Sequence, residues 1–179
     1  MTKHLEAQIK KIKLLALDVD GVLTNGNINI GQDGKETKVF DVQDGFGIVI
    51  IRHAGIKTAI ISARRAGAVI FRAKDLKIDK VYQDAYPKID AYEKMLRELK
   101  LKDEEVCFLG DDLPDLCILK RVGFAVSVPN GRSEVKKMAH YVTKNSGGKG
   151  AVREVVELIL KSQNKWDKIV KNYSSGAQQ

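Results

Sequence analysis

The sequence predicts an α/β protein with a mostly parallel, Rossmann-like sheet sandwiched between helices. Apolar runs of strand length alternate along the chain with segments whose apolar residues recur at helical spacing. The apolar runs are nearly continuous, as in LLAL at residues 14–17, and such strands are usually buried on both faces of a sheet. Strands of this kind alternating with helices are typical of a parallel sheet with helices on both sides.

The first half of the chain leads from a core strand through a hairpin to a helix and a second core strand. The turn GQDGKE separates two short strand-like segments, which predicts a two-stranded hairpin. In the helix that follows, Asp44 is the expected N-cap and Gly55 the expected glycine just past the C-terminus. In chain order we expect a strand at 12–19, strands at 27–30 and 37–42, a helix at 44–55 and a strand at 57–62.

The second half continues the alternation of helices and strands. Apolar residues fall at helical spacing in KIDAYEKMLRELK and again in GAVREVVELILK, whereas VCFL is a continuous apolar run and FAVSV is apolar except at Ser127. We expect helices at 64–77, 88–100, 113–122, 132–139 and 150–161, and strands at 80–83, 105–110, 124–128 and 141–143.

The organisation predicted is one domain over residues 1–179, because the sequence has neither an internal repeat nor a linker. The hairpin is an insertion at about 25–43, with no cap domain, and a flexible C-terminal tail occupies about 162–179. Glycines in the segment 145–154 suggest a mobile stretch before the last helix. We therefore expect a chain truncated from Gly147 to keep a folded, metal-binding core.

The composition is that of an ordinary globular protein, with 44% hydrophobic and 30% charged residues among 179. The net charge of +8 comes from Lys and Arg spread over helices and tails, and aromatics are only 6%, so we expect a solvated basic surface and no nucleic-acid partner. A nucleic-acid partner attracted by this charge is the alternative. With no apolar run of ~20 residues and no signal-peptide pattern, no membrane partner and a cytoplasmic location are expected. The two cysteines are too few for a disulfide framework.

Reactive side chains follow four of the predicted strands. In parallel sheets, ligands bind beyond the carboxyl ends of the strands, so these side chains are expected to converge at one edge. Clustered carboxylates repel unless a cation joins them, and oxygen ligands without nearby His or Cys suit Mg²⁺. A hydroxyl and an ammonium beside such a site would hold a phosphate. The groups are Asp18 and Asp20, Ser62 with Arg64 and Arg65, Lys88, and Asp111, Asp112 and Asp115.

Three competing motifs fail on spacing. An EF-hand needs acidic residues at positions 1, 3 and 5 and glycine at 6, whereas Gly21 is the fourth residue counted from Asp18 and a strand precedes the loop. The segment SGGKGAV lacks the first glycine of a P-loop and the Ser or Thr after Lys149. The segment DGFG has no third glycine for a dinucleotide fingerprint.

The four motifs DVDGVLT, the Ser of IIS, Lys88 and GDDLPD occur in the order found in the haloacid dehalogenase superfamily, and the chain resembles its phosphohydrolases. Over about residues 10–162 it is also similar to the phosphatase family that acts on 3-deoxy-D-manno-octulosonate (Kdo) 8-phosphate in lipopolysaccharide precursor synthesis. Phosphatases of nine-carbon, sialic-acid-type sugar phosphates and non-catalytic oligomerisation domains resemble it too. The chain departs from the usual pattern at Val49, Ala63, Pro87 and residues 128–131.

The resemblance implies a catalytic role for each motif. Asp18 would be the nucleophile that forms an aspartyl-phosphate, and Asp20 the general acid and base. Asp18, the backbone carbonyl of Asp20, and Asp111 would hold Mg²⁺, while Ser62 and Lys88 would bind the phosphoryl oxygens. Two supporting residues, Asp112 and Asp115, would position the metal ligand, although a helix N-terminal charge is an equal alternative for the latter.

Substrate recognition is expected from arginines and a helix N-terminus. Arg64 and Arg72 are eight residues apart and would share one side of a helix, suited to a sugar-acid carboxylate or simply solvated. Asp44 and Gly45 open a helix whose free N–H groups suit anions or hydroxyls, and Asp20 and Lys88 complete the expected substrate-binding set. Because a lone hairpin is marginal in water, a neighbouring subunit is expected to cover it, and the resemblance implies a homotetramer.

Overall fold

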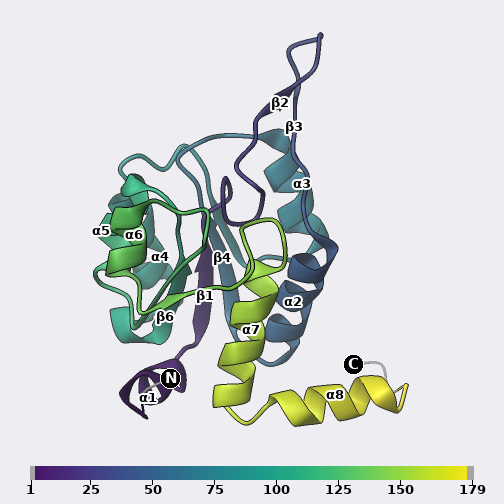
Figure 1. The fold of residues 1–179 in the computed structure, drawn as a ribbon, viewed down its shortest axis with the longest axis vertical. Helices are drawn as coiled ribbons and strands as arrows, with labels where there is room; N and C mark the ends of the chain where they lie inside the picture. Colours follow the sequence, from purple (N-terminus) through teal and green to yellow (C-terminus); the bar gives the residue numbers. More distant parts are fainter. Residues whose placement is uncertain (1–2, 177–179) are drawn as a thin grey trace.

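The computed structural model describes residues 3–176 and contains a six-stranded sheet in the order β5-β4-β1-β6-β7-β8 (Figure 1). Every neighbouring pair in this sheet is parallel, which confirms the predicted fold class. The chain builds outward from β1 in one direction and then in the other, so a topological switch point lies beside β1. The strands are β1 (Leu14–Leu17), β4 (Lys57–Ile61), β5 (Lys80–Tyr82), β6 (Val106–Leu109), β7 (Phe124–Ser127) and β8 (Tyr141–Val142).

Helices cover both faces of the sheet and bury two apolar cores. Leu15 and Leu17 of β1 belong to one core, and Leu14 and Ala16 belong to the other, which explains why β1 is apolar without alternation. The first core is lined by α2 (Val42–His53), α3 (Gly67–Asp75) and α7 (Ala151–Ser162), with α1 (Lys3–Ile9) below; the second by α4 (Lys88–Leu99), α5 (Leu116–Leu119) and α6 (Ser133–Met138). The 3₁₀ turns are η1 (Asp103–Glu105) and η2 (Leu113–Asp115). Within residues 3–176, none of the helices is both long and apolar enough to cross a bilayer.

The start of α2 differs from the sequence-based expectation. Asp41, not Asp44, is the N-cap, and its carboxylate accepts a hydrogen bond of 3.0 Å from the backbone N–H of Asp44. The Asp44 carboxylate instead accepts from the N–H groups of Gly150 (3.2 Å) and Arg153 (2.8 Å) at the start of α7. The segment DVQDG contains two acids three residues apart, and either could cap the helix. In the structure, Asp44 binds N–H groups of the distant α7, and Asp41 caps α2. The prediction for Gly55 is confirmed, since it follows the C-cap with φ of +83°.

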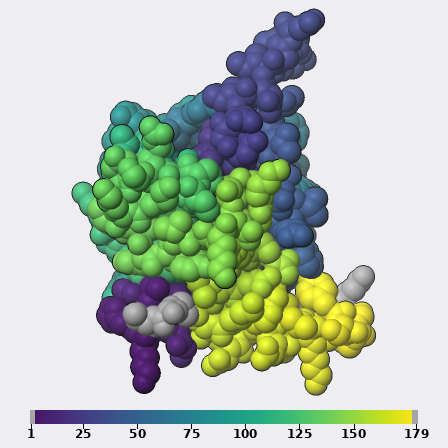
Figure 2. Space-filling model, in the orientation of Figure 1, coloured from purple at the N-terminus to yellow at the C-terminus, as the bar shows by residue number. Residues whose placement is uncertain are grey.

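The hairpin is shorter than predicted and projects from the body of the protein (Figures 1 and 2). It consists of β2 (Asn29–Ile30) and β3 (Glu36–Thr37), paired antiparallel in only two positions. The strand expected at 37–42 is therefore wrong beyond Thr37, because the chain leaves its partner there and runs back toward α2. Several large apolar side chains on and near the hairpin are exposed, namely Ile28, Ile30, Val39 and Val42.

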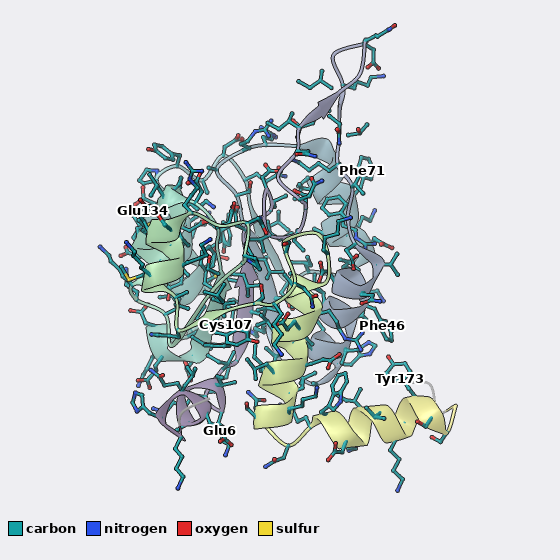
Figure 3. All side chains as sticks on the ribbon, in the orientation of Figure 1. Glu6, Phe46, Phe71, Cys107, Glu134 and Tyr173 are labelled. Atoms are coloured by element: carbon teal, nitrogen blue, oxygen red, sulfur yellow. The ribbon has the colours of Figure 1, made fainter. Side chains whose placement is uncertain are left out.

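The C-terminal region contains one buried helix and one surface helix. The helix α7 buries Val152, Val155, Val156, Ile159 and Leu160 completely. Part of the region expected to be a flexible tail forms α8 (Trp166–Ser174), an amphipathic helix that packs beside α7 and α2. Tyr173 of α8 and Phe46 of α2 point toward each other, with ring centroids 5.4 Å apart (Figure 3). Residues 177–179 of that tail lie outside the described residues.

Candidate active site

The carboxyl ends of β1, β4 and β6 bring together the side chains that the sequence placed there. Asp18 follows β1 directly, Ser62 follows β4, and Asp111 follows β6 after one glycine. They line one open pocket of about 260 Å³, which confirms that groups far apart in sequence converge at this edge. The pocket is also lined by Asp20, Arg64, Lys88, Asp112 and Asp115.

Lys88 is held between two buried carboxylates. Its Nζ lies 2.8 Å from Asp18 Oδ1 and 2.5 Å from Asp115 Oδ1. The other oxygen of Asp115 accepts from the backbone N–H groups of Asp111 (2.9 Å) and Asp112 (3.2 Å). Both Asp115 oxygens are thus engaged within the protein, so this carboxylate positions Lys88 and the loop after β6. Burial lowers the pKa of Lys88, but the negative charges of Asp18 and Asp115 more than offset this and raise it above its ordinary value.

The geometry at Asp18 and Asp111 fits a divalent cation. Carboxylate oxygens of Asp18, Asp111 and Asp115 lie within 4.8 Å of one another. Asp111 Oδ1 is buried and has no hydrogen-bond partner among the described residues. Burial, with the negative charge of Asp115, raises the pKa of Asp18 to about 7, and burial with the charges of Asp18 and Asp115 raises that of Asp111 to about 8. A cation between Asp18 and Asp111 would offset this repulsion and complete the coordination of Asp111.

Ser62 and Asp112 lie at the rim of the carboxylate cluster. The Ser62 hydroxyl is nearly buried and accepts a hydrogen bond of 3.3 Å from the backbone N–H of Arg64, so its own proton is available for an anion. Asp112 is exposed and caps η2 by accepting from the Leu113 N–H at 2.8 Å. Its side chain therefore shapes the loop after β6.

Asp20 forms ion pairs with a lysine of the hairpin and an arginine of the loop after β4. Lys38 Nζ lies 2.5 Å from Asp20 Oδ1 and 2.7 Å from Glu36 Oε1. Arg64 reaches Glu36 Oε2 at 2.8 Å and Asp20 Oδ2 at 3.5 Å. Sequence reasoning missed Lys38 and Glu36. Their spacing of two residues, which places them on one face of an extended strand, was the available signal.

The segment before α7 is tied to the loop after β1. Asn130 donates from its side chain to the Gly21 carbonyl (2.8 Å) and accepts from the Gly147 N–H (2.8 Å). A Cβ on Gly147 would lie 1.8 Å from the Gly21 carbonyl oxygen, so the two backbones are in direct contact. The Glu154 carboxylate accepts from the N–H groups of Lys144 and Asn145. These contacts hold the segment before α7 against the loop that carries Asp20.

Three residues expected to bind substrate lie in a different place in the single chain. Asp44, Gly45 and Arg72 line a small hollow between α2 and α3, apart from the carboxylate pocket. Arg72 contacts the Asp41 carbonyl at 3.4 Å and the Asp75 carboxylate at 2.8 Å. The helix α3 begins only at Gly67, so Arg64 and Arg72 do not share one helix face as expected.

The chain is similar to hydrolases of known sequence. A family profile described as haloacid dehalogenase-like hydrolase matches residues 69–156. The 3-deoxy-D-manno-octulosonate 8-phosphate phosphatase of Yersinia pestis is 44% identical over 154 residues, covering 86% of this chain and 82% of that protein. The Escherichia coli K12 protein of the same name is 42% identical over 161 residues, covering 90% and 86%.

Solved structures of similar proteins have the same fold. The Moraxella catarrhalis 3-deoxy-D-manno-octulosonate 8-phosphate phosphatase, in complex with magnesium, phosphate and KDO, superposes with a TM-score of 0.94 at 40% identity, covering 97% of this chain and 99% of that one. The cobalt-bound Haemophilus influenzae phosphatase has a TM-score of 0.85 at 32% identity and covers 88% and 92%.

Proposed function

The chain belongs to the haloacid dehalogenase-like hydrolases, within the family of the 3-deoxy-D-manno-octulosonate 8-phosphate phosphatases, and from this we propose that it hydrolyses that phosphomonoester to Kdo and phosphate. The observation that carries the proposal is the pocket at the ends of β1, β4 and β6, where Asp18, Asp111 and Lys88 meet in a fold shared with a relative that holds magnesium, phosphate and KDO. The reaction would serve lipopolysaccharide precursor synthesis, in the cytoplasm. A nine-carbon sugar-acid phosphate is the alternative substrate.

The proposed mechanism has two displacements at phosphorus. A carboxylate oxygen of Asp18 attacks the phosphorus, the bond from phosphorus to the sugar oxygen breaks, and Asp20 gives its proton to the departing alkoxide. In the second half, Asp20 takes a proton from water as that water attacks the aspartyl-phosphate, which releases phosphate and restores Asp18. Lys88 and Ser62 are proposed to hold the phosphoryl oxygens, which their position beside Asp18 supports.

Mg²⁺ is the metal we propose for this site. Asp18, Asp111 and the backbone carbonyl of Asp20 would hold it, while Asp112 and Asp115 support the loop. The unpartnered, buried oxygen of Asp111 supports this assignment. When bound, the ion neutralises the repulsion between a carboxylate nucleophile and a phosphate dianion.

Substrate recognition and assembly are proposed to involve a neighbouring subunit in a homotetramer, with no nucleic-acid or membrane partner. Exposed apolar residues on the projecting hairpin support a covering partner there. Arg64 borders the catalytic pocket and is proposed to meet the sugar-acid carboxylate. Asp44, Gly45 and Arg72 remain proposed substrate contacts, but their hollow lies away from this pocket.

The direct test is turnover by the purified protein with and without metal. We expect hydrolysis of Kdo 8-phosphate with added Mg²⁺, its loss after chelation with EDTA, and its recovery when Mg²⁺ is restored. The measurement is phosphate release across a panel that includes nine-carbon sugar-acid phosphates. Preference for the nine-carbon substrate would favour the alternative, and inactivity on every phosphomonoester would favour a non-catalytic oligomerisation domain.

Gly21→Ala is expected to weaken Mg²⁺ binding by roughly tenfold or more, the scale of losses when the groups around a metal ligand are changed. Gly21 has φ of +88°, and a Cβ there would lie 2.1 Å from Asp111 Oδ2. The methyl group must therefore displace the Asp111 carboxylate. Mg²⁺ affinity measured by isothermal titration calorimetry reports this displacement.

Gly34→Ala is the matched control for the backbone cost. Gly34 has φ of +74°, and a Cβ there meets nothing within 4 Å among the described residues. Both variants should lose about 1–2 kcal/mol of stability from the left-handed backbone, but only Gly21→Ala should lose metal affinity. Equal Mg²⁺ affinities of the two variants would show that a Cβ at position 21 does not displace the Asp111 carboxylate from the metal.

A further inference from the structure

Four charged side chains from three separate segments form a closed ring over the rim of the active site. Asp20 comes from the loop after β1, Glu36 and Lys38 from the returning arm of the hairpin, and Arg64 from the loop after β4. The four contacts between them run from 2.5 to 3.5 Å. Two of the four side chains are acidic and two are basic. We call these four residues the Asp20 ring.

Lys38 is the buried member of the Asp20 ring. Its side chain is 1% exposed, whereas Asp20 and Glu36 are 22% and 20% exposed and Arg64 is 42% exposed. An ammonium removed from water in this way must be paired, and the two carboxylates pair it at 2.5 and 2.7 Å. The position of Lys38 is therefore fixed by the same contacts that fix Asp20. Arg64 approaches Asp20 only at 3.5 Å and from solvent, so it is the weaker restraint.

We propose that Lys38 is a positioning residue that orients Asp20 for proton transfer to the leaving group. An ammonium has three donors and no acceptor, so Asp20 Oδ1 is engaged as an acceptor toward Lys38. Within residues 3–176, Asp20 Oδ2 has only the longer contact with Arg64, so it is the oxygen left to exchange a proton with the sugar oxygen and then with water. A general acid contributes fully only when its oxygen is held within hydrogen-bond reach of the reacting atom.

The hairpin thereby acquires a part in the chemistry. Between β1 and α2 the chain forms the loop that carries Asp20 and then the hairpin. Lys38 links these two segments directly through its hydrogen bond to Asp20. This inference rests on the proposed phosphatase function and adds a residue to it. Its distinguishing consequence is that losing Lys38 should matter most where the leaving group needs a proton.

The test compares Lys38→Met with Lys35→Met on two substrates. For Lys38→Met we expect kcat on the sugar phosphate to fall by roughly 10- to 100-fold, part of the ~10²- to 10⁴-fold that a general acid supplies. With an aryl phosphate, whose leaving group departs without a proton, the loss should stay below about threefold, and KM for both should change little. Lys35 is on the same hairpin with its side chain 84% exposed, so Lys35→Met should leave both rates unchanged.

A double-mutant cycle separates positioning from general damage. If Lys38 acts through Asp20, then adding Lys38→Met to Asp20→Asn should lower kcat by less than about twofold. Lys38→Arg, which keeps a cation and several donors, should recover part of the loss. Equal losses on aryl and sugar phosphates, no loss on either, or the same loss in both backgrounds would each overturn the proposal.

The test must also cover a variant that does not fold and a wild type that does not hydrolyse Kdo 8-phosphate. Should Lys38→Met fail to fold, as judged by thermal unfolding, the same ratios are measured for Lys38→Gln, which keeps a donor without the charge. If the wild type hydrolyses another alkyl phosphate but not Kdo 8-phosphate, the proposed substrate is wrong, and the comparison proceeds unchanged with that ester. A wild type without phosphatase activity would overturn both.

Discussion

Asp18→Asn is expected to lower kcat by at least about 10⁴-fold, the scale of loss when a covalent nucleophile is removed. An amide cannot form the aspartyl-phosphate, so no phosphoenzyme should be trapped by acid quench and detected by mass spectrometry. The fold should persist, because burial and the charge of Asp115 already disfavour the ionised form of Asp18. Thermal unfolding of the variant checks that the loss is chemical.

Asp20→Asn is the control that separates the two aspartates. This variant keeps the nucleophile and loses only proton transfer, so the loss should be ~10²- to 10⁴-fold. Aryl phosphates should partly restore its rate, whereas they should not restore that of Asp18→Asn. Identical inactivity of both variants on aryl and sugar phosphates would contradict the assigned roles.

A chain truncated from Gly147 is expected not to fold, contrary to the expectation from sequence. The deletion removes five fully buried Val, Ile and Leu residues of α7, each worth roughly 1.5–3 kcal/mol of burial. Their sum is comparable to the whole stability of a typical domain, about 5–15 kcal/mol. Far-UV circular dichroism and thermal unfolding would show the loss of a cooperative transition.

The matched truncation ends at Lys165 and removes only α8 and the residues beyond it. No residue of α8 is buried, and Lys165, whose Nζ donates to the Ala54 carbonyl at 3.0 Å, is kept. This shorter deletion should retain a cooperative transition at a modestly lower temperature. A cooperative transition in the chain truncated from Gly147 would instead show that the sheet folds without α7.

Local signals explain which parts of the structure could be predicted. The core strands are continuous apolar runs, and their carboxyl ends share one edge of a parallel sheet, so the convergence of Asp18, Ser62 and Asp111 follows from the chain itself. Lys88 joins them because it opens the next helix, α4.

Long-range contacts explain what could not be predicted. The choice between Asp41 and Asp44 as N-cap depends on N–H groups of α7 more than a hundred residues away. The position of Arg72 depends on how α3 packs against α2. The position of Lys38 depends on how the chain turns back toward the body of the protein after the hairpin. Arg72 has no local pattern that distinguishes it from an ordinary surface cation, and the one local signal for Lys38 is its spacing of two residues from Glu36.

The two-sided burial of β1 also bears on how such an enzyme can diversify. Each of its four residues belongs to one of two cores and is paired with a strand on either side. Inserting one residue in β1 would move each side chain after it from one core to the other. Mutation therefore cannot easily shift Asp18 along the strand. The two hairpin strands, Asn29–Ile30 and Glu36–Thr37, contribute no residue to either core. Evolutionary change in what is bound is therefore least costly in the turn of the hairpin, residues 31–35, away from Glu36 and Lys38, while the position of the nucleophile stays inherited.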